Sequence, residues 1–271
     1  MKRKIALGVV LALILAFCFA AVFAPVLAPH PPEEQNLCAG LSGPSHNHIL
    51  GQDKLGRDVL SRMIYGARVS LIVGVAVVLI SALVGFLVGA MAGAFGGTID
   101  QVIMRLIDLL MAFPGILLAI ALAAVLGPGL GNVIFALSLL GWVGYARLTR
   151  AQVLVERERP YYEAARALGA GRLRLIFRHL APNVSGPVLV QASFGIAGAI
   201  LSEAALSFLG LGTQKIPSFG SLLSHGINFL RTAPHLTIFP GLAVFLLVIS
   251  FNLLGDFLGD YLRVEEKGRA K

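Results

Sequence analysis

Six long apolar segments follow one another along the chain, with shorter polar stretches between them. A helix needs about 20 mainly apolar residues to cross the hydrocarbon core of a bilayer. The segments that reach or approach this length are residues 5–27, 69–95, about 103–126, 130–146, 184–211 and 238–258. Their apolar runs are continuous, which favours membrane helices over the alternating strands of a membrane barrel. The pattern therefore predicts an all-α polytopic membrane protein with about six transmembrane helices.

The first apolar segment follows the basic cluster Lys2, Arg3 and Lys4, an order also found in secretory signal peptides. The apolar region of a signal peptide usually has about 7–15 residues, and the uncharged stretch here is longer. We therefore expect this segment to remain in the protein as a transmembrane helix.

The distribution of basic residues predicts the orientation of the helices, because cytoplasmic loops carry an excess of Lys and Arg. With the N-terminus in the cytoplasm, six spans leave 16 of the 22 basic residues inside and six outside. Both termini are therefore expected to be cytoplasmic. The chain divides into an N-terminal transmembrane helix (1–28), an external loop (29–68), a core of five transmembrane helices (69–262) with a cytoplasmic loop (147–182), and a cytoplasmic tail (263–271).

Composition supports a membrane protein and excludes an ordinary soluble domain. Hydrophobic residues make up 57% of the chain and charged residues 13%, with a mean hydropathy of +0.84, whereas soluble domains carry roughly 25% charged residues. The net charge of +8 fits topology-determining loops, so we expect no nucleic acid partner. Cys18 and Cys38 have no metal-binding spacing, and Cys18 lies too deep in its segment for a disulfide with Cys38.

Small residues recur at every fourth position of the second segment: Ser81, Gly85, Gly89 and Gly93. This spacing puts them on one helix face and predicts a tight seam with another helix, within the chain or in a partner. Pro114 and Pro240 lie within the third and last segments, where each is expected to bend the helix. Such a bend is equally compatible with a hinge at which the helix moves and with a rigid bend.

Few charged residues fall inside the predicted spans. Arg105 and Asp108 are three residues apart and are expected to pair, whereas Asp256 and Asp260 lie where the last span ends and can be solvated. Glu203 lies within the fifth span with no helical neighbour to neutralise it. An intramembrane carboxylate is a functional candidate, so Glu203 is a possible translocation-path residue. A position against a partner helix or an outer vestibule stays open.

The loop 147–182 has eight arginines and an ordered apolar pattern. Apolar residues follow helical spacing in two sets, separated by a step at Gly169 and Gly171. The first set is Tyr161, Ala164, Ala165 and Leu168, and the second is Leu173, Ile176, Phe177 and Leu180. We predict two short amphipathic helices joined at a glycine corner, with Pro160 starting the first and Pro182 ending the second. The loop is then either an interfacial element on anionic lipid or a docking element for a cytoplasmic partner.

The chain lacks motifs that carry chemistry by themselves. It has no G-x-x-x-x-G-K-[ST] phosphate-binding loop, no H-E-x-x-H and no G-x-S-x-G, so we predict no enzyme activity and no catalytic residue. His46 and His48 lack a third ligand, so no metal site is predicted. Three functions stay open: a permease driven by a partner ATPase, a secondary transporter or channel, and an anchor without a pathway. The long amphipathic loop favours the first, because a self-sufficient carrier needs no docking surface.

The triplet Glu163-Ala164-Ala165 followed by Gly169 resembles the "EAA" loop of ATP-binding-cassette (ABC) importer permeases. The wider resemblance is to the dipeptide, oligopeptide and nickel family, and specifically to its second (C-type) permease subunit. It covers roughly residues 51–260. The matching stretches are GQDKLGRDVLSRMIYGARVSL from Gly51, RLIDLLMAFPG from Arg105, YARLTR from Tyr145, YYEAARALGAGRLRLIFRHLAPN from Tyr161, EAALSFLGLG from Glu203 and NLLGD from Asn252.

The resemblance implies a type I ABC importer permease that forms half of a translocation path for peptides, or for nickel or another small solute. It implies a coupling helix that contacts a separate ATPase through Glu163, Ala164, Ala165, Arg166, Leu168 and Gly169. The expected partners are a second permease in a heterodimer, two ATPase subunits that bind ATP-Mg, an extracytoplasmic solute-binding protein and membrane lipid. The resemblance also implies a multi-pass protein of a bacterial or archaeal inner membrane. No cofactor is expected on this chain itself.

Overall fold

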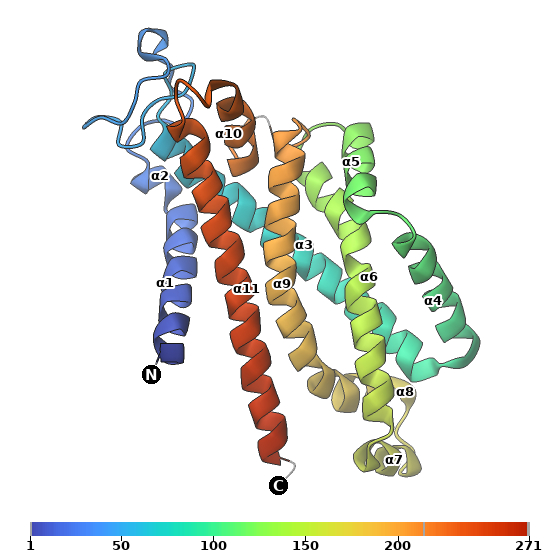
Figure 1. The fold of residues 1–271 in the computed structure, drawn as a ribbon. Helices are drawn as coiled ribbons and strands as arrows, with labels where there is room; N and C mark the ends of the chain where they lie inside the picture. The colour runs from blue at the N-terminus through green and yellow to red at the C-terminus, as the bar shows by residue number, and fades with distance from the viewer. Residues whose placement is uncertain (1, 214, 270–271) are drawn as a thin grey trace.

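The structure is a computed structural model that describes residues 2–213 and 215–269. In these residues the fold is helical, and the only extended pairing is an isolated bridge between Gln52 and Asp58. The elements are α1 (Lys2–Val22), α2 (Ala24–Leu27), η1 (Leu37–Ala39), α3 (Val59–Phe95), α4 (Gly97–Met111), α5 (Gly115–Leu126), α6 (Leu130–Arg157), α7 (Pro160–Ala167), α8 (Arg172–Arg174), η2 (Leu175–Leu180), α9 (Ala181–Phe208), α10 (Phe219–Gly226), η3 (Ile227–Phe229) and α11 (His235–Arg269) (Figure 1).

The helices agree with the predicted class of a polytopic membrane protein. Within the described residues, five helices are long and apolar enough to cross a membrane, and the bent pair α4–α5 makes six if it forms one span. The fifth span is part of a continuous helix from Arg172 to Phe208, which joins α8, η2 and α9. About six transmembrane helices are therefore confirmed.

The third span is bent at the position of Pro114. α4 and α5 meet at 81°, and Pro114 is the residue just before α5, with φ −61°. Proline has no amide hydrogen and clashes with the preceding turn, so α4 cannot run on through it. The predicted bend is confirmed. By contrast, α11 continues through Pro240, which lies in its second turn.

Two helices extend beyond the apolar segments that predicted them. α3 begins at Val59 instead of residue 69, because the Asp58 side chain accepts a hydrogen bond from the amide of Ser61 and caps the helix. α6 continues to Arg157 instead of residue 146. Hydropathy marks the part of a helix that suits the bilayer, while backbone hydrogen bonding continues until a cap or a turn ends it.

The small residues of α3 form a tight seam with α6, within this chain. A Cβ atom added to Gly85 would lie 2.5 Å from the Trp142 carbonyl oxygen, and one added to Gly93 would lie 2.7 Å from Val153. These distances are shorter than real Cβ atoms tolerate, so only glycine permits this approach. The predicted seam is confirmed, and it holds α3 where it crosses the bundle diagonally (Figure 1).

Ion pairs join α4 to α6. Arg147 of α6 contacts Asp108 at 2.7 Å, and Arg150 pairs with Asp100. The expected pair between Arg105 and Asp108 is wrong, because Asp108 pairs with Arg147 of α6 instead. Within the described residues Arg105 makes no ion pair and is exposed.

The bundle has two ends with different structures. We call the end that carries α7 and α8 the α7 end, and the opposite end, with α2 and α10, the α10 end (Figure 1). α1 begins and α11 ends toward the α7 end, where Arg3 pairs with Asp260 and lies over the ring of Phe257. Asp260 is exposed, as expected, and it also pairs with Arg3. This arrangement fits the expectation that both termini lie on one side of the membrane.

Candidate functional site

The loop at the α7 end begins where the sequence predicts. Arg159 is extended and Pro160 is the first residue of α7, a position where the missing amide hydrogen of proline costs nothing. α7 ends at Ala167, and Gly169, two residues later, has a φ of +82° in the left-handed region. An L-residue is strained by about 1–2 kcal/mol in that region, so glycine permits the corner that follows α7. The predicted glycine corner is confirmed at Gly169.

The second half of the loop differs from the prediction. It does not end at Pro182, because η2 is a π-helical segment that leads without a break into α9. Pro182 is in the first turn of α9, and the wider π turn before it lets the helix pass the proline. Movement of the loop therefore acts directly on the span that follows it.

The buried face of the loop is built by large apolar side chains. Leu175, Ile176 and Leu180 are buried together with Tyr162, and they pack against Ala90 of α3, Val153 of α6 and Val184 of α9. The prediction assigned Ile176 and Leu180 to the apolar faces and missed Tyr162. Helical periodicity finds apolar positions but does not tell which of two adjacent tyrosines faces the bundle.

The opposite face of the loop is apolar and exposed. Leu168 is 89% exposed, and Leu173 and Phe177, which the pattern also assigned to the apolar faces of the two helices, are exposed too. The residues expected to contact an ATPase lie together here: Glu163, Ala164, Arg166, Leu168 and Gly169 are exposed, and Ala165 is half-buried. We call these six residues the coupling surface. Exposed leucines beside charged residues are typical of a surface that a partner covers.

A hollow of about 480 Å³ borders the coupling surface. Ala165 and Leu168 line one part of it, and Arg174, Arg178 and His179 supply polar and positive groups. The hollow thus combines an apolar wall with basic side chains. An acidic and partly apolar partner surface fits this combination.

Hydrogen bonds fasten the coupling surface to the spans. The Tyr161 hydroxyl donates to Glu156 of α6 at 2.6 Å and accepts from Asn183 of α9 at 3.1 Å. Burial and the bond to Glu156 raise the pKa of Tyr161 to about 12, so the hydroxyl keeps its proton and stays a donor. Arg157 also donates to the Gly93 carbonyl of α3 at 2.6 Å. The Tyr161 bonds therefore link α7 to α6 and α9, while Arg157, the last residue of α6, links α6 to α3.

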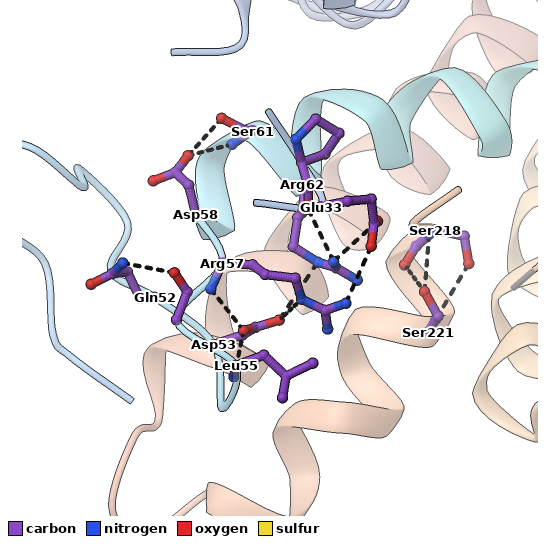
Figure 2. A network of polar contacts seen from close by, with 12 residues as sticks. Glu33, Gln52, Asp53, Leu55, Arg57, Asp58, Ser61, Arg62, Ser218 and Ser221 are labelled. Atoms are coloured by element: carbon purple, nitrogen blue, oxygen red, sulfur yellow. Dashed lines mark hydrogen bonds and ion pairs between the residues drawn. The ribbon is translucent and has the colours of Figure 1, made fainter. Parts of the chain in front are cut away.

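At the α10 end, a network of charged groups surrounds the start of α3 (Figure 2). Asp53 is buried and accepts from the Arg57 side chain at 2.7 Å and from the Arg57 amide at 3.0 Å. Glu33, which is 56% exposed, contacts both Arg57 and Arg62 at 3.4 and 3.3 Å. Sequence analysis did not find this network, because Glu33 lies more than twenty positions from its partners. The cap at Asp58 had a local signal, an Asp directly before an apolar run.

A cavity of about 340 Å³ opens beside this network. Arg57 and Arg62 line one wall, and Ser207, Ser221 and His225 line another. Burial lowers the pKa of His225, and the positive charges of Lys54, Arg62 and Arg57 lower it further, against a smaller opposing effect of Asp53. His225 is therefore more often neutral than an exposed histidine at the same pH.

Glu203 lies inside the bundle, close to this cavity. Its side chain is 1% exposed and accepts hydrogen bonds from Ser70 of α3 at 2.9 Å and from Ser207 at 2.6 Å. A partner from another helix, which the sequence pattern did not show, thus satisfies this carboxyl group. In this conformation Glu203 joins α3 to α9, one layer behind the cavity wall at Ser207.

The part of the chain that contains the α7 end matches a known protein family. The model described as "Binding-protein-dependent transport system inner membrane component" matches residues 85–264, which include the seam, the loop and the coupling surface. The chain belongs to this family. It is accordingly a multi-pass inner-membrane transport component, as the predicted class and localisation state.

Relatives within this transport family are identical to this chain at about half of the aligned positions. The dipeptide transport system permease protein DppC of Escherichia coli (strain K12) is 51% identical over 86% of this chain and 80% of its own length. The glutathione transport system permease protein GsiD of Escherichia coli O6:K15:H31 (strain 536 / UPEC) is 46% identical over 84% of this chain and 75% of its own. The resemblance to peptide permeases is therefore confirmed.

A solved structure supports the fold of this inner-membrane component. A chain of the MetNI methionine ABC transporter, in an inward-facing conformation, matches with a TM-score of 0.61. The match covers 73% of this chain and 95% of that chain, at 16% sequence identity. At this identity the likeness establishes the permease fold.

Proposed function

We propose that this chain is a permease subunit of an ATP-driven importer of short peptides, in which it forms half of the translocation path. Its relatives DppC and GsiD are named for dipeptide and glutathione transport, and both solutes are short peptides. Selectivity among peptides is expected to reside largely in an extracytoplasmic binding protein. The partners are that protein, a second and non-identical permease, two ATPase subunits that hold ATP-Mg, and membrane lipid.

The coupling surface is the observation that carries this proposal. It presents Leu168, which is 89% exposed, next to Glu163 and Arg166, and the Tyr161 hydrogen bonds tie it to α6 and α9. An exposed apolar side chain in water is unfavourable by roughly 25 cal/mol per Å² of apolar surface. A groove on an ATPase subunit that covers this surface removes the apolar side chains from water and at the same time binds the loop.

The mechanism follows from how the loop is attached. When two ATPase subunits close on ATP, they carry the coupling surfaces of the two permeases with them. Because the loop leads through η2 into α9 without a break, α9 moves with it against α3. This movement alternates the path between inward-open and outward-open states. Glu203 bridges α3 and α9, so we propose that it borders the path where these helices move.

The test is co-purification of this permease with its ATPase subunits. Glu163→Lys reverses a charge within the coupling surface, and Gly169→Asp strains the corner and adds a charge. Both variants are expected to reduce the bound ATPase by at least tenfold while the two permeases still associate. Glu34→Lys makes the same change of charge at the α10 end and is expected to retain the ATPase. If Glu163→Lys and Gly169→Asp retain wild-type ATPase, the coupling surface does not dock it.

A further inference from the structure

Three potential metal ligands from separate parts of the chain converge at the α10 end. His30 follows α2, His48 lies in the loop before α3, and Asp58 is the cap of α3. One ligand atom from each lies within 4.8 Å of the others. The two imidazole rings lie against each other, with centroids 4.5 Å apart. The cluster lies outside the coupling surface, and the proposed transport function does not use it.

The carboxylate of this cluster is oriented by its neighbours. One oxygen of Asp58 accepts from both the amide and the hydroxyl of Ser61 at 2.7 Å. The other oxygen is directed at Nδ1 of His48, 2.9 Å away. Asp58 is 2% exposed, so its position is set by protein contacts rather than by water. Hydrogen bonds that fix a ligating carboxylate are a regular feature of metal sites.

The backbone of His30 is held by the same serine. Its amide donates to the Ser61 hydroxyl oxygen at 3.1 Å, and prolines on both sides, Pro29 and Pro31, restrict the chain. The ring Nε2 contacts the Asn47 carbonyl oxygen at 2.9 Å. Ser61 therefore holds both the carboxylate of Asp58 and the backbone of His30 in place before any ion arrives.

A cavity of about 170 Å³ opens onto the cluster. His30, His48 and Asp58 line it together with Glu34, an exposed carboxylate. This volume admits an ion with bound water, and Glu34 or a water molecule offers a fourth ligand. Zinc–nitrogen bonds are about 2.0 Å long, so the ligand atoms of a tetrahedral site lie roughly 3.3 Å apart. The three ligand atoms already lie within 4.8 Å of one another, so the site closes around an ion if the side chains shift by about 1–2 Å.

We propose that His30, His48 and Asp58 bind one divalent transition-metal ion. Two imidazole nitrogens and a carboxylate oxygen suit zinc, nickel, cobalt or copper, whereas magnesium and calcium prefer oxygen ligands alone. The ion replaces the hydrogen bond between His48 and Asp58 and binds both side chains. The His30 ring gives up its contact with the Asn47 carbonyl oxygen and binds the ion instead. The metal then fastens the segment after α2 to the start of α3. His46, which the sequence had paired with His48, is exposed and outside the cluster.

The test is a titration of the purified, chelator-treated full chain, without a histidine tag, in detergent. Co²⁺ serves as the spectroscopic probe because its visible absorption reports nitrogen and oxygen coordination, and Zn²⁺ displaces it in competition. We expect one Co²⁺ per chain. His30→Ala is expected to weaken Co²⁺ binding at least tenfold, and His46→Ala, the matched control in the same loop, is expected to leave it unchanged.

Thermal unfolding of the same samples gives a second readout that needs no transport. Zn²⁺ is expected to raise the melting temperature of the wild-type chain and of His46→Ala, but not that of His30→Ala. Wild-type protein that binds no Co²⁺ in stoichiometric amount overturns the proposal. Equal binding by His30→Ala, or equal loss in His46→Ala, overturns it too. None of these outcomes depends on whether the chain transports peptides, so the two proposals are tested separately.

Discussion

At the residue scale, the charged network at the start of α3 contains a strong interaction, made by Asp53, and a weak one, made by Glu33. Asp53 is buried and accepts three hydrogen bonds, from the amides of Leu55 and Arg57 and from the Arg57 side chain. Glu33 contacts Arg57 and Arg62 at longer distances and is 56% exposed. Removing one partner of a buried ion pair leaves an uncompensated charge, whereas an exposed partner is replaced by water.

We therefore expect Asp53→Asn and Glu33→Gln to differ strongly in stability. Asp53→Asn should destabilise the protein by about 3–5 kcal/mol, and Glu33→Gln by about 1 kcal/mol or less. Thermal unfolding of both variants in the same detergent measures the difference. Similar melting temperatures for the two variants would mean that Asp53 does not organise the network.

The lowered pKa of His225 predicts that the stability of the folded protein depends on pH. Its pKa is lowered in the folded protein by burial and by Lys54, Arg62 and Arg57, so the folded state binds a proton less readily than the unfolded chain. The stability from this residue is present above about pH 6.5 and is lost as the pH falls through the lower folded-state pKa. Melting temperature should therefore fall more steeply with acidification in the wild type than in His225→Gln. Parallel curves from pH 8 to 5 would contradict this sign.

At the element scale, the sequence predicts helices better than their ends or faces. Apolar length identifies the spans because the bilayer fixes the length required. The early start of α3 depends on the Asp58 cap, and the burial of Tyr162 depends on packing against α3 and α6. The cap is a local contact with Ser61 that a count of apolar residues overlooks, whereas the packing of Tyr162 is set by contacts distant in sequence. The bend at Pro114 and the seam at Gly85 were predictable, because proline and glycine act through local geometry.

The corner after α7 gives a prediction with a control two residues away. Gly169 has φ +82°, whereas Gly171 has φ −65°, and neither has a neighbour within 4 Å of an added Cβ atom. Gly169→Ala is strained by about 1–2 kcal/mol and is expected to reduce ATPase association several-fold. Gly171→Ala is expected to behave like the wild type. Co-purification and ATPase activity of the assembled complex measure both, and equal behaviour of the two variants would argue against a fixed corner.

At the scale of the whole molecule, the two ends of the bundle carry different kinds of site. The α7 end presents an exposed apolar surface on a loop that is bonded to α6 and α9. The α10 end holds buried charges, a cavity and the histidine cluster. The sequence predicts the first, because one continuous loop carries it. It does not predict the second, since His30, His48 and Asp58 meet only through the tertiary fold.

We propose that this chain is driven by partner ATPase subunits and receives force from them at the coupling surface. The most direct measurement is ATP-dependent uptake of a labelled dipeptide into liposomes, by this chain alone and by the complete assembly with the second permease, the ATPase subunits and the binding protein. We expect uptake only by the complete assembly, and at least a tenfold loss when it carries Glu163→Lys. Uptake by the chain alone, or full uptake by the Glu163→Lys assembly, would contradict the account.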